Sequence, residues 1–249
     1  MRNYIIFSDL DGTLLDHKTY TFDPALEALS IIKSRQIPLI LSSSKTRTEI
    51  ERIQSHLTLK DPFIFENGSG VFYNNQVVSF GINLTEIHDK ITPLQKTFNF
   101  NCYSLLTIEQ AIHYTGLTEE EAKLSQQRQF SEPIIWLDDE ERKNDFLEKI
   151  HQLGLNATQG GRFLTISSHH DKAKALKWIK NSLENDYQTK FISIALGDGE
   201  NDISMINACD IKILIKNNNE HLQRSDWVLS EMCGTSGWNQ EILKVLNYE

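Results

Sequence analysis

The sequence of 249 residues has few cysteines, no excess of basic residues and no long apolar run. Its three cysteines (Cys102, Cys209 and Cys233) are widely spaced and form no CxxC pair, so they offer neither a disulfide framework nor a zinc site and suit a reducing cytoplasm. A net charge of −9 argues against general nucleic-acid binding, which needs a basic surface. No apolar stretch approaches the roughly 20 residues of a membrane helix, and Met1 leads into a strand pattern rather than a signal peptide.

The residues that are present fit a soluble, globular chain. Hydrophobic residues make up 39% and charged residues 24%, and the length suits one large domain or two modest ones. There is no internal repeat and no low-complexity segment. Because the net charge repels anions, an anionic substrate would have to be met by a local group of basic side chains.

The first and last thirds of the sequence alternate between strand and helix patterns. Continuous apolar segments predict buried strands, and apolar residues at helical spacing follow them. The expected strands are 4–8, 37–41, 63–65, 191–196, 211–215 and 226–229, with a hairpin over 71–80; the expected helices start at Pro24 or cover 46–56, 172–183, 203–208 and 238–246. This order predicts an α/β fold with a doubly wound parallel sheet and helices on both faces.

The middle of the chain has a different composition. It is richer in charged residues, and its apolar segments over 133–137 and 163–167 predict two further strands between helices. We therefore expect a catalytic core of residues 1–83 and 163–249, with a smaller α/β cap domain of residues 84–162 inserted into it.

The stretch FSDLDGTLLD, at positions 7–16, puts two carboxylates two residues apart directly after an apolar strand. Positions i and i+2 of a strand point to the same side, so Asp9 and Asp11 are expected close together, and Gly12 allows a sharp turn after them. Two anions at that distance repel, so a cation or a raised pKa must compensate. The alternative is a solvated turn, because aspartate and glycine are ordinary turn residues.

Other polar side chains follow the remaining strands. The carboxyl ends of parallel strands meet at one edge of the sheet, and ligands bind at that edge. Besides the two aspartates, the residues at these ends are Ser43, Ser44, Lys45 and Arg47 after the second strand, Asn67 after the third, and Asp198, Asn201 and Asp202 in GDGEND. Acids, hydroxyls and bases therefore converge on one edge.

The spacing of these motifs resembles the haloacid dehalogenase superfamily of phosphotransferases over the whole chain. DLDGTLLD is similar to the first motif of that superfamily, Ser43 stands at the second, Lys172 in HHDKAKAL at the third, and LGDGENDISMI at the fourth. LSSSKTRTEIE, FENGSGVF, FSEPIIW, GGRF and GTSGWNQEIL resemble the mannosyl-3-phosphoglycerate phosphatase family in particular. Thr165, Ala173 and Thr235 depart from that family's usual histidine, glycine and proline, which weakens the assignment of the sugar as mannose.

The resemblance implies that Asp9 is the nucleophile and Asp11 the general acid and base, with Mg²⁺ held by Asp9, the carbonyl oxygen of Asp11 and Asp198. The chemistry of these residue types agrees, since Mg²⁺ prefers oxygen ligands and an aspartate can attack phosphorus to form an aspartyl-phosphate. Ser43 and Lys172 are expected to bind the phosphoryl oxygens, where charge spreads in the transition state.

The inserted module is expected to act as a lid that excludes water and selects the substrate, and the resemblance implies a phosphorylated glycosyl-glycerate. An arginine can hold a carboxylate with two hydrogen bonds, and a glutamate can accept bonds from two sugar hydroxyls. The candidate substrate-binding residues are Ser44, Lys45 and Asn67 of the core and Arg128, Glu132 and Arg162 of the cap.

Several of these residues have alternative roles that involve no substrate. One of Ser42–Ser44 is a candidate helix cap, and Lys172 or Arg128, taken alone, would be an ordinary solvated residue. Asp202 and Asn201 are expected to support the metal site from outside, with Asp202 as a helix N-cap residue rather than a ligand.

The sequence leaves more than one function open. The leading prediction is a Mg²⁺-dependent phosphatase that hydrolyses mannosyl-3-phosphoglycerate or a related glycosyl ester. The alternatives are a phosphatase of other sugar phosphates, a phosphomutase or phosphotransferase of the same superfamily, and a non-catalytic sugar-phosphate sensor. The intact pair of Asp9 and Asp11 argues against a sensor, and no feature for retaining and turning a product supports a mutase. The oligomeric state stays open.

Overall fold

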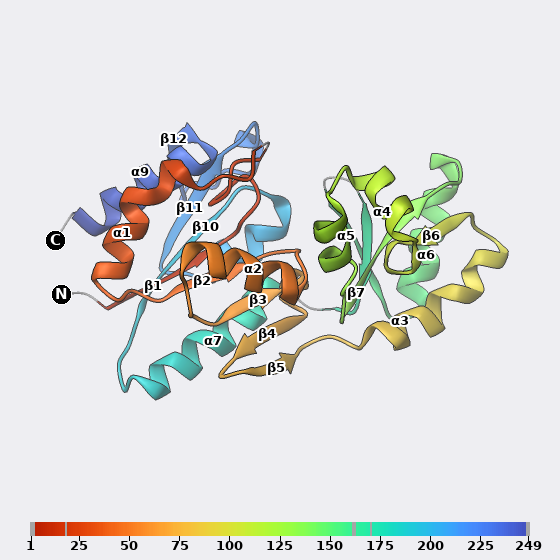
Figure 1. The fold of residues 1–249 in the computed structure, drawn as a ribbon, viewed down its shortest axis with the longest axis horizontal. Coiled ribbons are helices and arrows are strands. Elements are labelled where there is room, and N and C mark those ends of the chain that lie inside the picture. The colour runs from red at the N-terminus through yellow and green to blue at the C-terminus, as the bar shows by residue number, and fades with distance from the viewer. Residues whose placement is uncertain (1–2, 18, 161–162, 170, 248–249) are drawn as a thin grey trace.

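The computed structural model describes residues 3–17, 19–160, 163–169 and 171–247. The chain forms two lobes that lie side by side, and each lobe has its own β-sheet (Figure 1). No helix in this part of the chain is both long enough and apolar enough to cross a lipid bilayer.

The large lobe is built on an eight-stranded sheet with the order β12-β11-β10-β1-β2-β3-β4-β5. Its strands are β1 (Tyr4–Ser8), β2 (Leu39–Ser42), β3 (Phe63–Phe65), β4 (Gly70–Tyr73), β5 (Gln76–Ser79), β10 (Ile192–Gly197), β11 (Ile211–Lys216) and β12 (Val228–Cys233). The strands from β12 to β3 are parallel, and β4 and β5 add an antiparallel hairpin. The α/β architecture expected from the sequence is confirmed.

Helices cover both faces of this sheet, because its strands carry apolar side chains on both sides. In β1, Ile6 packs toward one face, and Ile5 and Phe7 pack toward the other. The first face carries α1 (Leu26–Ser34), α2 (Arg47–Leu57) and α9 (Gly234–Asn247), and the second carries α7 (Lys172–Asp186) and α8 (Ile203–Asn207). The sheet is thus a rigid base whose carboxyl edge can hold side chains in fixed positions.

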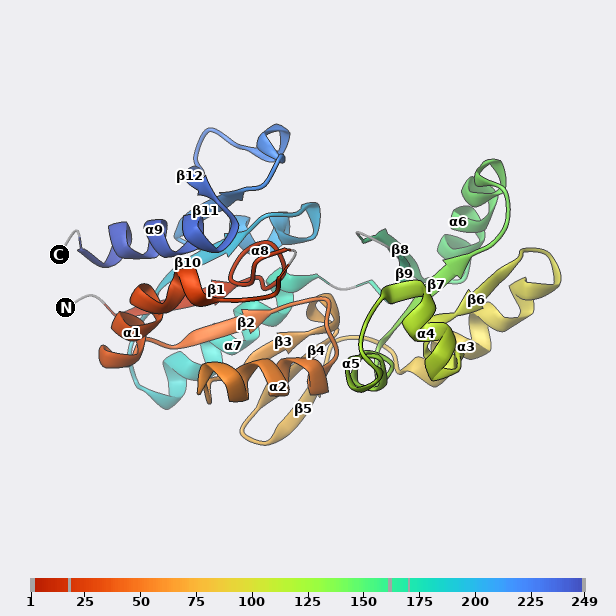
Figure 2. The same cartoon turned by 45° about the horizontal axis from the view of Figure 1, so that its top comes forward.

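The small lobe contains an antiparallel four-stranded sheet with the order β6-β7-β9-β8. Its strands are β6 (Phe100–Cys102), β7 (Ser131–Trp136), β8 (Asn156–Gln159) and β9 (Leu164–Ser167), and its helices are α3 (Leu84–Ile91), α4 (Ile108–Thr115), α5 (Glu119–Ser125) and α6 (Lys143–Gln152). Ile87 of α3 and Phe146 of α6 share a core with the sheet, whereas Ala111 of α4 and Ala122 of α5 form a second, smaller cluster. Figure 2 shows that α5 is the helix of this lobe that lies nearest the large lobe.

The position of β9 corrects the expected domain boundary. β9 pairs with β7 and β8 of the small sheet, so the second segment of the core begins after Ser167 and not at residue 163. The apolar pattern of 163–167 predicts a strand, but this pattern does not say which of two sheets the strand joins.

Candidate active site

Asp9 lies directly after β1, at the carboxyl edge of the large sheet. Its backbone N–H donates to the carbonyl oxygen of Leu196 in β10 (2.9 Å), and its side chain is 8% exposed. The turn that follows needs Gly12, because φ is +80° there and a Cβ would lie 2.5 Å from Oδ2 of Asp198. This turn therefore brings the DLDGT motif against the GDGEND motif.

The ammonium group of Lys172 is buried beside Asp9. Its Nζ donates to Oδ1 of Asp9 (2.7 Å), to Oδ1 of Asp202 (2.7 Å) and to the carbonyl oxygen of Ser42 (3.1 Å). Burial alone would lower the pKa of Lys172, but the charges of Asp202 and Asp9 outweigh burial and raise this pKa above its ordinary value. Lys172 is therefore a fixed positive charge at the site and not a solvated lysine.

Close packing of the loop after β3 sets the start of α7. Gly68 has a φ of +95°, and a Cβ at this position would lie 2.5 Å from the carbonyl oxygen of Asp171. Asp171 caps α7, since its side chain accepts a hydrogen bond from the backbone N–H of Lys174 (2.8 Å). These contacts hold Lys172, the next residue, in the site.

Three carboxylates form an acidic cluster around Lys172. One oxygen of each of Asp9, Asp198 and Asp202 lies within 4.8 Å of the other two. Burial, and then the charge of Asp202, raise the pKa of Asp9 well above its usual range, and burial also raises the pKa of Asp198. One ammonium group does not balance three carboxylates, so a divalent cation fits this set of oxygen donors.

Both carboxylate oxygens of Asp202 accept hydrogen bonds from the protein, as those of a residue that supports a metal site without binding the ion would. Oδ1 accepts from Lys172, and Oδ2 accepts from the backbone N–H groups of Asp198 and Gly199 (3.1 Å each). Asp198 is held in turn by Asn217, whose Nδ2 donates to Oδ2 (2.7 Å). Asn217 was not among the expected site residues, although its position directly after β11 at the same sheet edge could have identified it.

Asp11 has a lysine of its own. The Nζ atom of Lys45 lies 2.9 Å from Oδ2 of Asp11, whereas Oδ1 is buried and has no hydrogen-bond partner among the described residues. Burial alone would lower the pKa of Lys45, but Asp11 and Glu49 raise it above its ordinary value. The two neighbouring carboxylates of the DLDGT motif are thus neutralised by different lysines, one from α7 and one from the loop after β2.

The serines after β2 are placed differently from one another. Ser43 is buried, and its Oγ accepts from the backbone N–H of Lys45 (3.2 Å), whereas Ser44 is exposed. Thr46, and not one of the serines, caps α2, where it forms a capping box with Glu49. The serines are therefore not needed for the helix start.

A buried carboxylate joins the core to the segment that leads into β7. Glu66 is 1% exposed and accepts hydrogen bonds from the backbone N–H groups of Gln129 (2.8 Å) and Phe130 (3.0 Å). It also accepts a bond from Oγ of Ser131 (2.6 Å). Glu66 was not among the expected residues, because its partners lie more than 60 residues away in the sequence.

Two of the three cap residues expected to bind substrate have hydrogen-bond partners within the protein. The side chain of Arg128 is 8% exposed, and its Nη2 donates to the carbonyl oxygen of Ser44 (2.9 Å), so Arg128 ties the cap to the core. Glu132 is fully buried within the cap, where it accepts a bond from the backbone N–H of Ser104 (3.0 Å), so it is not open to sugar hydroxyls. Arg162 lies outside the described residues.

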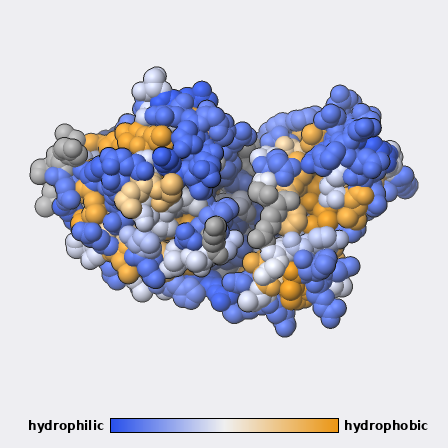
Figure 3. Space-filling model, turned by 90° about the horizontal axis from the view of Figure 1, so that it is seen from above, coloured by the Kyte–Doolittle hydropathy of each residue, from blue (hydrophilic) through white to orange (hydrophobic). Residues whose placement is uncertain are grey.

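A polar cavity of about 190 Å³ lies between the two lobes. Its lining includes Asn67, Lys172 and Asn201 of the core, and Asn156, Thr158 and Thr165 of β8 and β9. Seen from above, the surface is hollowed between the lobes (Figure 3). Hydroxyl and amide groups of the cap sheet therefore face the side of the site where Lys172 lies.

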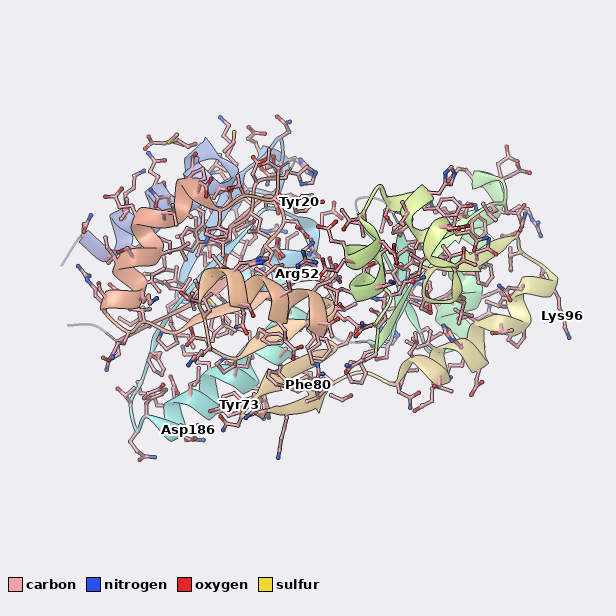
Figure 4. The ribbon with its side chains drawn as sticks, in the orientation of Figure 1. Tyr20, Arg52, Tyr73, Phe80, Lys96 and Asp186 are labelled. Atoms are coloured by element: carbon pink, nitrogen blue, oxygen red, sulfur yellow. The ribbon has the colours of Figure 1, made fainter. Side chains whose placement is uncertain are left out.

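A second cavity, of about 220 Å³, lies beside Lys45, the lysine that is paired with Asp11. Lys45 lines it together with Tyr20 and Arg52 of the core and Leu117 and Glu121 of the cap. Tyr20 and Arg52 lie at the end of the large lobe that is nearest the small lobe (Figure 4). Since both cavities are bounded by both lobes, a ligand in either one would contact the cap as well as the core.

Comparisons with known proteins agree with this arrangement. Two curated relatives, from Persephonella marina and Methanococcoides burtonii, are each named glucosyl-3-phosphoglycerate/mannosyl-3-phosphoglycerate phosphatase. Each relative is 35% identical to this chain, and the match covers 98% of this chain and 97% of the relative. A phosphatase structure of the haloalkanoate enzyme superfamily from Bacteroides thetaiotaomicron superposes with a TM-score of 0.74 at 19% identity, covering 100% of this chain and 96% of that one. A structure from Thermoplasma acidophilum also has a TM-score of 0.74, at 18% identity and full coverage of both chains.

The structural matches show the fold, and the sequence matches show the family. The family model described as haloacid dehalogenase-like hydrolase matches residues 6–231, which include both lobes and all four motifs. The resemblance stated from the motifs is confirmed: the chain belongs to the haloacid dehalogenase-like hydrolases.

Proposed function

We propose that this protein is a Mg²⁺-dependent phosphatase that hydrolyses a glycosyl-3-phosphoglycerate, with mannose or glucose as the sugar, to the glycosylglycerate and phosphate. The observation that carries the proposal is the group formed by the buried Asp9 and Lys172 and the half-buried Asp198 at the carboxyl edge of the sheet. The substrate class rests on the names of the two relatives at 35% identity. We place the activity in the cytoplasm, where the free thiols Cys102 and Cys209 would stay reduced.

The acidic cluster fits Mg²⁺ as the cofactor. Asp9 and Asp198 would supply carboxylate oxygens, and Asp11 its backbone carbonyl oxygen, while Asp202 stays engaged by protein donors. Mg²⁺ bound here would neutralise the carboxylates and the phosphate that approaches them. Burial raises the pKa values of both Asp9 and Asp198, and the charge of Asp202 adds to the rise at Asp9, so a bound cation would stabilise both carboxylates in their charged form.

The proposed mechanism assigns a separate step to each aspartate. Asp9 attacks phosphorus and forms an aspartyl-phosphate, while Lys172 fixes one of its oxygens and, with Ser43, binds the phosphoryl oxygens. Asp11 donates a proton to the leaving oxygen, then takes a proton from the water that cleaves the aspartyl-phosphate. Lys45 holds the Asp11 carboxylate in position between these steps.

The polar cavity supports a sugar-bearing substrate. Thr158, Thr165 and Asn156 offer hydroxyl and amide groups that can pair with sugar hydroxyls. The glycerate carboxylate needs a cation, and we propose Arg162 for this role, together with Lys45, which lines the second cavity and whose loop also carries the exposed Ser44. Asn67, with Asn201 hydrogen-bonded to it at 3.4 Å, would close the core side of the cavity.

A substrate panel tests the proposal directly. Mannosyl- and glucosyl-3-phosphoglycerate, simple sugar phosphates and an aryl phosphate would be assayed for released phosphate, with Mg²⁺ and after chelation. We expect the highest kcat/KM for the phosphoglycerates and loss of activity after chelation, with recovery on adding Mg²⁺. Equal turnover of all esters would contradict the substrate class. Transfer of the phosphoryl group to a sugar without release of free phosphate would indicate a mutase. Binding of the ester without turnover would indicate a sensor.

A further inference from the structure

A second group of metal-type ligands lies inside the cap, away from the active site. His88 of α3, Cys102 of β6 and Glu132 of β7 each place one ligand atom within 4.8 Å of the other two. They come from three different elements and are far apart in the chain, which is why no ligand motif shows in the sequence. None of the three lines the polar cavity between the lobes.

The register of the cap sheet explains how these side chains meet. Cys102 pairs with Ile134, and Glu132 pairs with Ile166, so both residues lie on the sheet face that carries these isoleucines. The same face packs against Ile87 of α3 in the main core of the cap. A glutamate and a thiol thus stand at the end of an otherwise apolar layer, under the helix that carries His88.

Glu132 is a buried carboxylate that no lysine or arginine among the described residues pairs with. Its side chain has no exposed surface, and its carboxylate is bonded to the backbone N–H of Ser104 (3.0 Å), the Ser104 hydroxyl and Nε2 of His88 (2.5 Å). Burial, and then the charge of Glu132, raise the pKa of the Cys102 thiol to about 12. A bound cation would give this buried carboxylate a charged partner in addition to its hydrogen bonds.

We propose that His88, Cys102 and Glu132 form a binding site for Zn²⁺ in the cap. Imidazole, thiolate and carboxylate are the three side-chain ligands of zinc, and a thiolate favours Zn²⁺ over Mg²⁺. Ser104 or a water molecule would complete a tetrahedron. The all-oxygen set of the active site has the opposite preference, so the two sites would discriminate between the two metals.

Binding would replace an existing hydrogen bond. Two ligands of one tetrahedral Zn²⁺ stand about 3.3 Å apart, which is more than the 2.5 Å between Nε2 of His88 and Oε2 of Glu132. The proton that these two atoms share, and the proton of the Cys102 thiol, would be released to solvent. The bound ion would then cross-link α3, the first helix after the core, to β6 and β7, and so would stabilise the cap.

Cobalt provides a probe that reports on the thiol. Co²⁺ would be titrated into the chelator-stripped full-length protein in the presence of excess Mg²⁺, which occupies the active site. We expect a thiolate-to-cobalt charge-transfer band in the near ultraviolet that saturates at one equivalent and disappears when Zn²⁺ is added. The carboxylates of the active site cannot give this band, so the test is independent of the proposed function.

Matched cysteine variants assign the band. Cys102→Ser should abolish it, whereas Cys233→Ser, which changes an exposed cysteine outside the cluster, should leave it intact. His88→Ala, at a side chain that is 20% exposed, should weaken binding at least tenfold and serves as a second test if the cysteine variant folds poorly. Zn²⁺ should also raise the melting temperature of the wild type but not of either cluster variant.

The proposal would be overturned by a wild-type titration without the band, or by a band that survives in Cys102→Ser. A Zn²⁺-dependent rise in melting temperature that is equal in wild type and His88→Ala would have the same meaning. In each case the three residues would form a hydrogen-bonded network only.

Discussion

Each aspartate of the DLDGT motif has its own lysine, and this pairing would separate the roles that we propose for them. Lys172 binds Asp9 from α7, and Lys45 binds Asp11 from the loop after β2. A nucleophile and an acid–base group two residues apart need different electrostatic environments, and separate lysines would provide them. Substitutions at Asp9 and Asp11 test this division.

Replacing Asp9 with asparagine should abolish phosphate release. The amide is neither a nucleophile nor an anionic ligand, so kcat should fall by at least about 10³-fold. Circular dichroism should show an unchanged fold, because Asn fills the same volume. Asp23→Asn, which changes an exposed aspartate nearby, is the control and should keep full activity. Residual turnover of a few per cent in Asp9→Asn would point to another nucleophile.

Replacing Asp11 with asparagine should make the rate depend on the leaving group. A sugar-type alkoxide needs protonation as it leaves, whereas an aryl oxide needs little, so formation of the aspartyl-phosphate should be slowed far more for the natural ester. Single-turnover kinetics with both substrates measures this step directly. The acid role would be wrong if both esters lost the same factor.

At the scale of the elements, the strand ends bring together motifs that are far apart in the chain. This part of the site could be predicted, because continuous apolar strands in an alternating α/β pattern fix both the sheet and its ligand-binding edge. The start of a helix at Lys172 could also be predicted, because Lys172 precedes apolar residues at helical spacing.

The contacts of the cap could not be predicted in this way. Arg128 and Glu132 stand in a motif that favours substrate binding, but hydrogen bonds to Ser44 and Ser104 occupy them. These partners depend on how the lobes and strands pack, and a single sequence, taken without an alignment, carries no signal for such pairs. For the same reason β9 was expected in the wrong sheet, since its apolar pattern fits either one.

The cap strands β8 and β9 make a testable contribution to specificity. Thr158 and Thr165 are cross-strand partners and both line the polar cavity. Changing either one to valine removes a hydroxyl while keeping the shape, which should lower kcat/KM for the glycosyl-phosphoglycerate about threefold to tenfold per lost hydrogen bond.

The control for these variants is an aryl phosphate, which carries no sugar and should lose less than twofold in the same proteins. Thr92→Val, at an exposed threonine of the cap outside the cavity, should change neither substrate. Equal losses for both substrates would mean that the threonines support the fold of the cap rather than contact the sugar.

At the scale of the whole molecule, stability depends on the pH-dependent cost of its buried acids. Asp61, between α2 and β3, is partly buried outside the active site. Burial raises its pKa to about 6, and hydrogen bonds from the backbone at Leu39 and at Asp61 itself offset only part of that rise. The folded protein therefore binds a proton at Asp61 more tightly than the unfolded chain, in which an aspartate has a pKa of about 3.9.

This difference predicts how Asp61 affects the free energy of unfolding. Below about pH 4 Asp61 is protonated in both the folded and the unfolded state, so it does not lower the free energy of unfolding. As the pH rises from about 4 to 6, the unfolded chain loses this proton first and the folded state becomes less stable. Above about pH 6 the destabilisation by the Asp61 charge is fully present. The substitution Asp61→Asn should therefore raise the free energy of unfolding at pH 7.5 by about 1–2 kcal/mol, after allowance for solvent screening. It should have no such effect at pH 4. Urea unfolding of both proteins across this range measures the difference, with Asp89→Asn, at an exposed aspartate of α3, as the control. A gain that is the same at pH 4 and pH 7.5 would show that the amide stabilises the loop through its hydrogen bonds and that the charge of Asp61 carries no cost.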